Sequence, residues 1–203
     1  MRLIGMLDSP YVRRVAISLR RMGLPFTHES TSVFRHYDVF AATNPVVKAP
    51  TLVTDAGVVL MDSTLILDYA DRLVPSGRRL SPEGVEAFAR HQRIVGLALA
   101  GCEKTVQIVY EHELRPEERR HAPWLSRIRG QLGEAYRLLE AEMGDGGWLF
   151  GEAPLQADIT AAVAWSFTHH MRPGEIDLEA CPRLATLAAR AEALEDFQAL
   201  PIS

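Results

Sequence analysis

The segment that most constrains the fold is residues 44–63, NPVVKAPTLVTDAGVVLMDS. It contains two runs of β-prone residues, Thr51 to Thr54 and Val58 to Met61, separated by the turn sequence Asp-Ala-Gly. Two such runs around a short glycine-containing turn predict a β-hairpin. Asp62 and Ser63 follow directly and precede a helical pattern, so the second strand is expected to lead into a helix N-terminus.

Pro50 stands at the start of the first of these two strands. Proline has no N–H to donate to a sheet, so the first position of a strand is one of the few places where it fits. It also pushes Ala49 into an extended conformation, in which the Ala49 backbone can pair with an extended ligand as an added strand would. The residues alone predict a trans Ala49-Pro50 bond, because only about 5–6% of X-Pro bonds in folded proteins are cis.

The first helix is predicted by its cap and its periodicity. Ser9 is a favoured N-cap, proline is favoured at the first helical position, and Gly23 is placed to end the helix. Apolar residues at i, i+3, i+4 and i+7 predict one buried face, and four arginines are expected on the other side. The apolar set is Val12, Val15, Ala16 and Leu19, and the arginines are Arg13, Arg14, Arg20 and Arg21.

The remaining elements of the first part alternate in type. Apolar residues from Leu3 to Leu7 predict a strand, Pro25 to Thr31 a second strand, Arg35 to Ala42 a short helix, and Ser63 to about Leu73 a helix after the hairpin. The order β-α-β-α-β-β-α combines parallel strand–helix–strand units with an antiparallel hairpin, which is the thioredoxin-like plan. The first helix has no cysteine, which argues against disulfide exchange through a protein thiol.

The second part of the chain is predicted to be entirely helical. Residues 74–84 (VPSGRRLSPEG) are typical of a linker, so the expected domains are 1–77 and 85–203. The expected helices run from Ser81 to about Tyr110, Trp124 to Met143, Gln156 to about Met171 and Pro182 to about Leu194, with a loop at 113–123 and a short turn after Asp196. The fold class is therefore an α/β domain followed by an all-α domain.

Composition argues against several kinds of partner. Residues 1–77 hold eight Lys and Arg against seven Asp and Glu, and the remainder holds fourteen against nineteen. Neither part has the basic excess that nucleic-acid binding requires. No apolar run approaches the roughly 18 residues of a membrane span, and Asp8 interrupts the N-terminus before a signal-peptide core forms. We therefore expect a cytoplasmic protein that binds neither nucleic acid nor membrane.

No metal site is expected. Cys102 and Cys181 lack metal-ligand spacing and are too few for a disulfide framework. His169 and His170 are adjacent rather than one helical turn apart. Glu111, like Glu103, is interpreted as a solvated charge on a helix.

The motifs NPVVKAPTL and MDSTLI resemble the glutathione-binding half of the cytosolic glutathione transferases, which carries N-P-x-x-K-x-P-x-L, a hairpin and then an acidic residue beside a serine. An all-helical second domain is also that family's layout, so the resemblance covers essentially the whole chain. It implies that Pro50 is cis and that Ala49 hydrogen-bonds the cysteinyl backbone of glutathione. It further implies that Asp62 and Ser63 hold the γ-glutamyl end of glutathione.

The resemblance also implies a reaction. Ser-Pro-Tyr resembles the Ser-Pro-Phe of the serine-type transferases, especially the plant tau class, whose serine hydrogen-bonds the glutathione sulfur. Ser9 is therefore either a plain N-cap or the catalytic residue, and a helix N-terminus does favour an anion such as a thiolate. Lys48 is either a solvated charge or a contact for the glycyl carboxylate. Residues that can line a second-substrate pocket by resemblance, or simply pack, are Tyr11, Glu103, Val106 and Tyr110.

The expected function is a glutathione S-transferase with glutathione as co-substrate, a small electrophile as second substrate, no metal, and a homodimeric assembly. The alternative is a non-enzymatic interaction protein that kept the fold. A glutathione-dependent isomerase of the zeta class is a third possibility, but its Ser-Ser-Cys signature is absent.

One family landmark fits imperfectly. The segment GEAPLQADI has Gly151, Ala157 and Asp158 in place, but Leu155 stands where the family has a hydroxyl residue. Losing that side-chain cap is expected to cost about 1 kcal/mol. Asp158 is interpreted as structural, accepting backbone N–H bonds in the first helical turn.

Overall fold

The structure is a computed structural model that describes residues 1–177 and 179–202. The chain divides into two compact units: residues 1–80 with the C-terminal segment from Ala193 on, and Ser81–Glu192. The expected second domain ran from 85 to 203, so its C-terminal segment differs from the expectation by lying with the first unit. Ser203, the end of that expected domain, lies outside the described residues.

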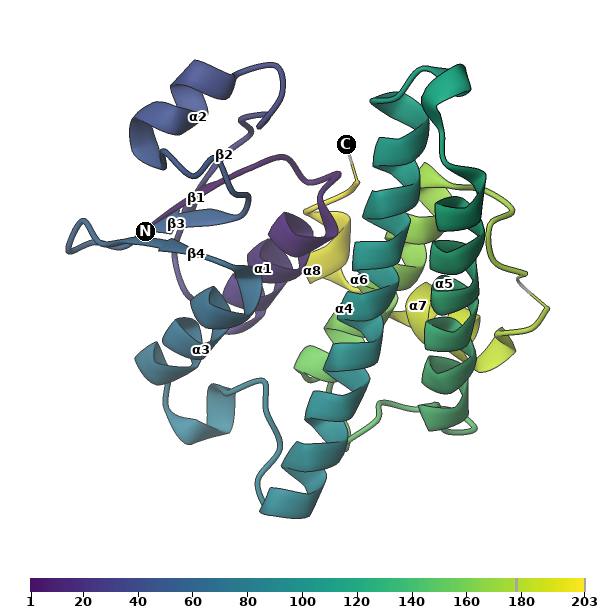
Figure 1. The fold of residues 1–203 in the computed structure, drawn as a ribbon. Coiled ribbons are helices and arrows are strands. Elements are labelled where there is room, and N and C mark those ends of the chain that lie inside the picture. The colour runs from purple at the N-terminus through teal and green to yellow at the C-terminus, as the bar shows by residue number, and fades with distance from the viewer. Residues whose placement is uncertain (178, 203) are drawn as a thin grey trace. The chain divides into compact units, whose positions relative to one another are not determined.

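The first unit is built on a mixed sheet in the order β2-β1-β3-β4. The β1–β2 pair is parallel, and the β1–β3 and β3–β4 pairs are antiparallel, which confirms the predicted mixture and the hairpin. Helices α1 and α3 lie on one side of the sheet and α2 lies on the other (Figure 1). The bounds are β1 Arg2–Ile4, α1 Pro10–Arg21, β2 Thr27–Glu29, α2 Tyr37–Thr43, β3 Thr51–Val53, β4 Val59–Met61, α3 Ser63–Leu73 and the 3-10 turn η1 Ser76–Arg78.

The first two strands are shorter than predicted. β1 ends at Ile4 because Gly5 turns the chain with a φ of +139°, so Met6 and Leu7 lie outside the strand. β2 ends at Glu29, whose carbonyl accepts a hydrogen bond from the Thr31 N–H at 2.9 Å in a tight turn.

The apolar face of α1 is buried as predicted, but two of its arginines are not on the solvent side. Arg13 and Arg14 are only 2% and 1% exposed. Arg13 is covered by the C-terminal segment: its Nε donates to the Leu200 carbonyl at 2.8 Å, and its guanidinium lies 5.4 Å from the Phe197 ring centroid. These two contacts to a distant part of the chain therefore replace the stabilisation that water would give to an exposed guanidinium.

The same segment forms α8 (Glu195–Gln198) and pairs with two further arginines of α1. Arg20 Nη2 lies 2.7 Å from Glu195, and Arg21 Nη1 lies 3.1 Å from Asp196. These pairs and the buried Arg13 contacts explain why the segment belongs to the first unit.

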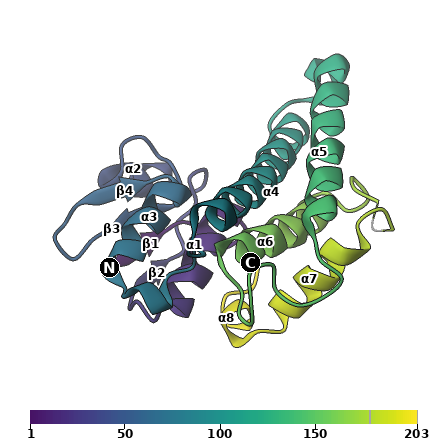
Figure 2. The same ribbon diagram turned by 90° about the horizontal axis from the view of Figure 1, so that it is seen from below.

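The second unit is helical, as predicted. It contains α4 Val85–Glu113, the 3-10 turn η2 Glu117–Arg119, α5 Ala122–Glu142, α6 Gln156–Met171 and α7 Pro182–Glu192. Helices α4 and α5 lie side by side as an antiparallel pair (Figures 1 and 2). α4 begins after Gly84, whose φ is +88°, and not at Ser81, while Pro123 belongs to the first turn of α5 and not to the loop. No helix in the described ranges is long and apolar enough to cross a bilayer.

Two acidic side chains are buried in this unit. Asp158 is fully buried and accepts the N–H of Leu155 and that of Leu149, each at 2.9 Å, which agrees with a structural role. Glu111 was expected to be solvated but is 5% exposed. Its carboxylate accepts the His121 N–H and pairs with Arg115, both at 2.9 Å, so these partners explain its burial.

A hydroxyl network lies between α4, α5 and α6. The Tyr136 hydroxyl donates to the Ala164 carbonyl at 2.8 Å and lies 2.6 Å from Thr168 Oγ1, which in turn lies 2.7 Å from Thr105 Oγ1. Tyr136 is 1% exposed, and this burial raises the pKa of its phenol well above the usual value near 10.

Candidate functional site

The sheet register brings the predicted glutathione residues to one end of the sheet. Ile4 at the end of β1 pairs with Thr51 at the start of β3, and Thr51 pairs with Met61 at the end of β4. Three segments therefore meet beside this row: the turn after β1, the loop before β3 and the start of α3. They carry the predicted residues Ser9, Lys48, Ala49, Pro50, Asp62 and Ser63.

The Ala49-Pro50 bond is cis, as the family resemblance implied and the residues alone did not. The turn after β1 passes close to it, because a Cβ built on Gly5 would lie 3.2 Å from the Ala49 Cβ and 2.5 Å from Val12 Cγ2. Only glycine fits there. In the described part of the chain, neither the N–H nor the C=O of Ala49 has a hydrogen-bond partner, which leaves both groups available to a ligand.

Asn44 holds the loop before Pro50, and sequence reasoning did not single it out. It is 4% exposed, its Nδ2 donates to Thr51 Oγ1 at 2.8 Å, and its Oδ1 accepts the Val46 N–H at 3.1 Å. The Thr51 hydroxyl in turn donates to the Lys48 carbonyl at 2.8 Å. An asparagine that bonds the backbone two residues on is a recognised turn former, so the Asn-Pro pair was a usable signal.

Asp62 and Lys48 lie together at the N-terminus of α3. Asp62 is the N-cap: its Oδ1 accepts the Thr64 N–H at 2.9 Å, and its Oδ2 lies 3.4 Å from Lys48 Nζ. The two side chains are 44% and 52% exposed. Asp62 has a φ of +72°, which is uncommon for a residue other than glycine and occurs often at functional sites.

Ser63 is buried behind this pair and is held by Arg14. The Ser63 side chain is 4% exposed, and Arg14 Nη1 donates to Ser63 Oγ at 3.0 Å and to Thr64 Oγ1 at 3.3 Å. The Ser63 N–H occupies the first position of α3 and has no acceptor within the helix. Sequence reasoning missed Arg14, because its helical position alone predicted exposure.

Ser9 caps α1 loosely. Its Oγ accepts a hydrogen bond from the Val12 N–H at 3.4 Å. This distance is longer than the usual value of about 2.9–3.0 Å for such bonds. The side chain is half-buried, and the described residues offer no acceptor for its O–H. A hydroxyl that accepts from the helix can therefore still donate to a ligand atom.

The expected second-substrate residues fall in both units. Tyr11 is half-buried on α1 of the first unit, and the other three lie on α4 of the second. Glu103, Val106 and Tyr110 are spaced by three and four residues along α4, so they share a face of that helix. The Glu103 carboxylate accepts from Lys104 at 3.0 Å and from Gln107 at 2.8 Å. Their pocket role stays a prediction.

Within the described ranges, no group of three or more His, Cys, Asp or Glu side chains is arranged to hold a metal ion. The chemistry that this end of the sheet offers is hydrogen bonding and charge pairing.

Comparison with known families covers both units. The sequence profile for the N-terminal domain of glutathione S-transferases matches residues 3–79, and the profile for the C-terminal domain matches residues 122–190. The chain belongs to the glutathione S-transferase family. Its general type is therefore that of a glutathione transferase enzyme with a thioredoxin-like and a helical domain.

Several proteins similar to this transferase are named members of the same family. A solved glutathione S-transferase of Methylobacterium radiotolerans, in complex with glutathione sulfonate, has a TM-score of 0.90 and 29% identity, over 100% of this chain and 95% of that one. A probable glutathione S-transferase of Oryza sativa is 25% identical over 90% of this chain and 80% of its own length. A maleylacetoacetate isomerase of Pseudomonas aeruginosa is 26% identical over 72% of this chain and 71% of its own. The similar proteins thus include both transferases and an isomerase. Similarity alone therefore does not determine which reaction this member catalyses, and the residues of its site have to decide it.

Proposed function

We propose that this protein is a serine-type glutathione S-transferase. Glutathione binds at the end of the sheet in the first unit, and Ser9 stabilises its sulfur as the thiolate. The thiolate then attacks a small hydrophobic electrophile. The observation that carries the proposal is the hydroxyl of Ser9, which lies at a helix N-terminus and has no acceptor for its proton in the described residues.

Each polar part of glutathione has a partner of the right kind in this proposal. The unpaired N–H and C=O of Ala49 pair with the cysteinyl backbone. Asp62 takes the γ-glutamyl ammonium, and the Ser63 N–H at the start of α3 takes the neighbouring carboxylate. Lys48 takes the glycyl carboxylate.

Binding of glutathione requires the Lys48–Asp62 ion pair to open. That pair is about half exposed, and exposed pairs contribute only about 0–1 kcal/mol, so its loss is small. Each of the two charges receives an opposite charge from the ligand in exchange. Before glutathione binds, the ion pair holds both side chains at the site.

Ser9 acts on the thiolate without accepting a proton. A thiol has a pKa of about 8.5, and lowering it by about two units requires roughly 2.7 kcal/mol of preference for the thiolate. One hydrogen bond to a charged group contributes about 1.5–3 kcal/mol, and a helix N-terminus adds about 0.3–1 kcal/mol. The sum suffices without a general base, and the thiol proton leaves to water.

The chemical step is a nucleophilic substitution or addition. The thiolate sulfur donates an electron pair to the electrophilic carbon and a C–S bond forms. In a substitution the leaving group departs with the electrons of its own bond, and in an addition the neighbouring atom takes a proton from water.

Three substitutions at Ser9 separate catalysis from capping. Ser9→Ala removes both roles, Ser9→Asp keeps an acceptor for the helix but cannot donate to a thiolate, and Ser9→Thr keeps both. We expect the Ala and Asp variants to shift the pH–rate midpoint of conjugation upward by about one to two units, while Thr stays near wild type. Glutathione affinity, measured by calorimetry, should be nearly unchanged in Ala and Thr.

The rates are measured with glutathione and a panel of aromatic and alkyl electrophiles between pH 5.5 and 9. If the Asp variant restores wild-type activity, or if the Ala variant is fully active at pH 6.5, Ser9 is only a helix cap. If the wild-type protein binds no immobilised glutathione, the non-enzymatic interaction protein becomes the better assignment. An isomerase of the zeta class is less favoured, because the Ser-Ser-Cys signature of that class is absent from the sequence.

A homodimer and a cytoplasmic location are also part of the proposal. Apolar side chains on β4 and the first turn of α3 are exposed in the single chain: Val59 by 43%, Met61 by 38% and Leu65 by 64%. A second copy can cover such a patch. Both cysteines are buried thiols, which agrees with a reducing compartment.

A further inference from the structure

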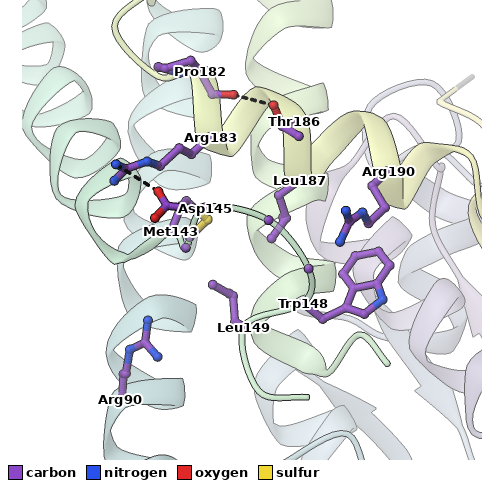
Figure 3. A pocket seen from close by; sticks show the side chains of 13 residues that line it. Arg90, Met143, Asp145, Trp148, Leu149, Pro182, Arg183, Thr186, Leu187 and Arg190 are labelled. Carbon is purple, nitrogen blue, oxygen red and sulfur yellow. Dashed lines mark hydrogen bonds and ion pairs between the residues drawn. The ribbon is translucent and has the colours of Figure 1, made fainter. Parts of the chain in front are cut away.

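The second unit contains a pocket that none of the predicted site residues lines. Its volume is about 330 Å³, within the range of small-molecule sites. One wall is the loop that follows α5, including Met143, Trp148 and Leu149, and the opposite wall is α7. Figure 3 shows the side chains of both walls around the pocket.

One face of α7 supplies the second wall. Arg183, Thr186, Leu187 and Arg190 are spaced i, i+3, i+4 and i+7, so they lie on the same side of the helix. The two arginines begin about 10 Å apart along the helix axis, from the rise of 1.5 Å per residue. Leu187, which is 6% exposed, lies between them and provides an apolar floor.

Arg190 is the pocket arginine that is available to bind a ligand anion. Its guanidinium lies 5.5 Å from the Trp148 ring centroid, and in the described ranges it has neither a carboxylate partner nor a hydrogen bond. Stacking on an aromatic ring orients a guanidinium but leaves its N–H groups for an anion. Figure 3 shows Arg190 beside Trp148 at one end of the pocket.

The other two pocket arginines, Arg90 and Arg183, are paired with carboxylates, and the pairing of Arg90 is the stronger. Arg90 donates to the Glu142 carbonyl at 2.8 Å and pairs with the Glu142 carboxylate at 3.3 Å, so it is already satisfied. Arg183 pairs with Asp145 at 3.2 Å, and these side chains are 51% and 93% exposed. An exposed pair of this kind is weak, so a ligand anion can compete with Asp145 for Arg183.

The charge of the pocket is opposite to that of its surroundings. The lining residues include three arginines and one aspartate, and because Arg90 is balanced by Glu142, the other charged residues of the lining carry a formal charge of +1. The unit Ser81–Glu192 holds twelve Lys and Arg against seventeen Asp and Glu, a formal charge of −5. A positive concave site in an acidic unit attracts anions selectively to that place.

The loop wall keeps the space open. Gly144, Gly146 and Gly147 carry no side chains, and the last two have φ values of +142° and +85° that favour glycine. The ligand thus meets backbone on this side and the apolar groups of Leu149 and Trp148 further in.

From these observations we propose that the pocket binds a small amphipathic organic anion. Its carboxylate or phosphate group pairs with Arg190 and draws Arg183 away from Asp145, and its apolar body lies against Leu187, Leu149 and Trp148. The inference does not depend on glutathione chemistry, because the pocket is lined by the second unit alone.

The test uses four probes in the full-length protein with saturating glutathione present: phenyl phosphate, benzoate, inorganic phosphate and benzyl alcohol. Affinities are measured by calorimetry, and the site is located by the indole N–H resonance of Trp148, assigned with Trp148→Phe. We expect one or both aromatic anions to bind and to shift that resonance. Inorganic phosphate should bind at least tenfold more weakly, and benzyl alcohol should not bind measurably. The better of the two aromatic anions identifies the head group.

Variants then test each contact. Arg190→Gln keeps most of the side chain without its charge and should weaken the aromatic anion at least tenfold. Asp145→Asn releases Arg183 and should strengthen binding about threefold, which corresponds to about 0.65 kcal/mol. Arg137→Gln is the matched control, because Arg137 is exposed, belongs to the same unit and does not line the pocket. Its affinity should equal that of wild type.

The proposal is overturned if neither aromatic anion binds at millimolar concentration or if the Trp148 resonance does not move. It is also overturned if benzyl alcohol binds as well as the anions, or if Arg190→Gln behaves like Arg137→Gln. Circular dichroism checks the fold of each variant. Should Arg190→Gln be unfolded, Arg183→Gln replaces it, and unchanged affinity in that variant would count against the site.

Discussion

The buried Arg13 should stabilise the first unit far more than its exposed neighbour Arg20, although both hold the same C-terminal segment. Arg13 bonds the Leu200 carbonyl at 2.8 Å and lies over Phe197 while only 2% exposed. Arg20 pairs at 2.7 Å with Glu195, and these side chains are 40% and 88% exposed. Replacing each by methionine removes the charge and keeps most of the apolar stem.

The expected magnitudes differ severalfold. A hydrogen bond from a charged donor contributes about 1.5–3 kcal/mol, and a desolvated cation–π contact up to about 2 kcal/mol. Removing a buried charge also returns part of its desolvation penalty, so Arg13→Met should cost about 2–4 kcal/mol. Arg20→Met removes the pair with Glu195 and a second pair, at 3.3 Å, with Asp196, and because Arg20 itself is 40% exposed the cost should be about 0–1 kcal/mol.

Urea unfolding of both variants measures the free energy of unfolding, and amide hydrogen exchange measures local opening. In Arg13→Met the amides of Ala199 and Leu200, which bond Glu195 and Phe197 carbonyls, should lose protection before the sheet does. The double substitution Arg13→Met with Phe197→Leu should show a coupling of about 0.5–2 kcal/mol. Equal costs for the two arginine variants, or a cost below 0.5 kcal/mol for Arg13→Met, would refute this reasoning.

Three further predictions concern the site, the core and the assembly. Asp62→Asn keeps the N-cap of α3 but removes the charge, so glutathione affinity by calorimetry should fall roughly tenfold, about 1.4 kcal/mol; unchanged affinity contradicts the assignment. Burial raises the pKa of Tyr136, so its contribution to stability is full below about pH 10 and is lost as the pH rises through the folded-state value. Wild type should therefore lose up to about 1.4 kcal/mol per pH unit above pH 10, and Tyr136→Phe should lose less in the same urea titrations. Sedimentation at micromolar concentration should give a dimer, and Leu65→Asp on the exposed α3 patch should give a monomer; a monomeric wild type counts against the proposal.

Local signals in the sequence were enough for the hairpin, the helices and the order of elements. α3 (Ser63–Leu73) and α6 (Gln156–Met171) have the predicted bounds, because caps, turns and periodicity lie within a few residues of each helix. The convergence of Pro50 and Asp62 could also be inferred, since a hairpin brings the start of one strand beside the end of the next. Their role toward glutathione came from the family motif and not from periodicity.

The tertiary structure alone decided which charges are buried. A helical pattern assigns Arg13 and Arg14 to the polar face, since it compares a residue only with its neighbours on the same helix. Their burial depends on partners elsewhere in the chain: Leu200 for Arg13, 187 residues away, and Ser63 for Arg14, 49 residues away. The same holds for the pocket, where Arg190 meets Trp148 from a different segment. Burying a charge is favourable only when a partner replaces its water, and the position of that partner is set by packing and not by local sequence.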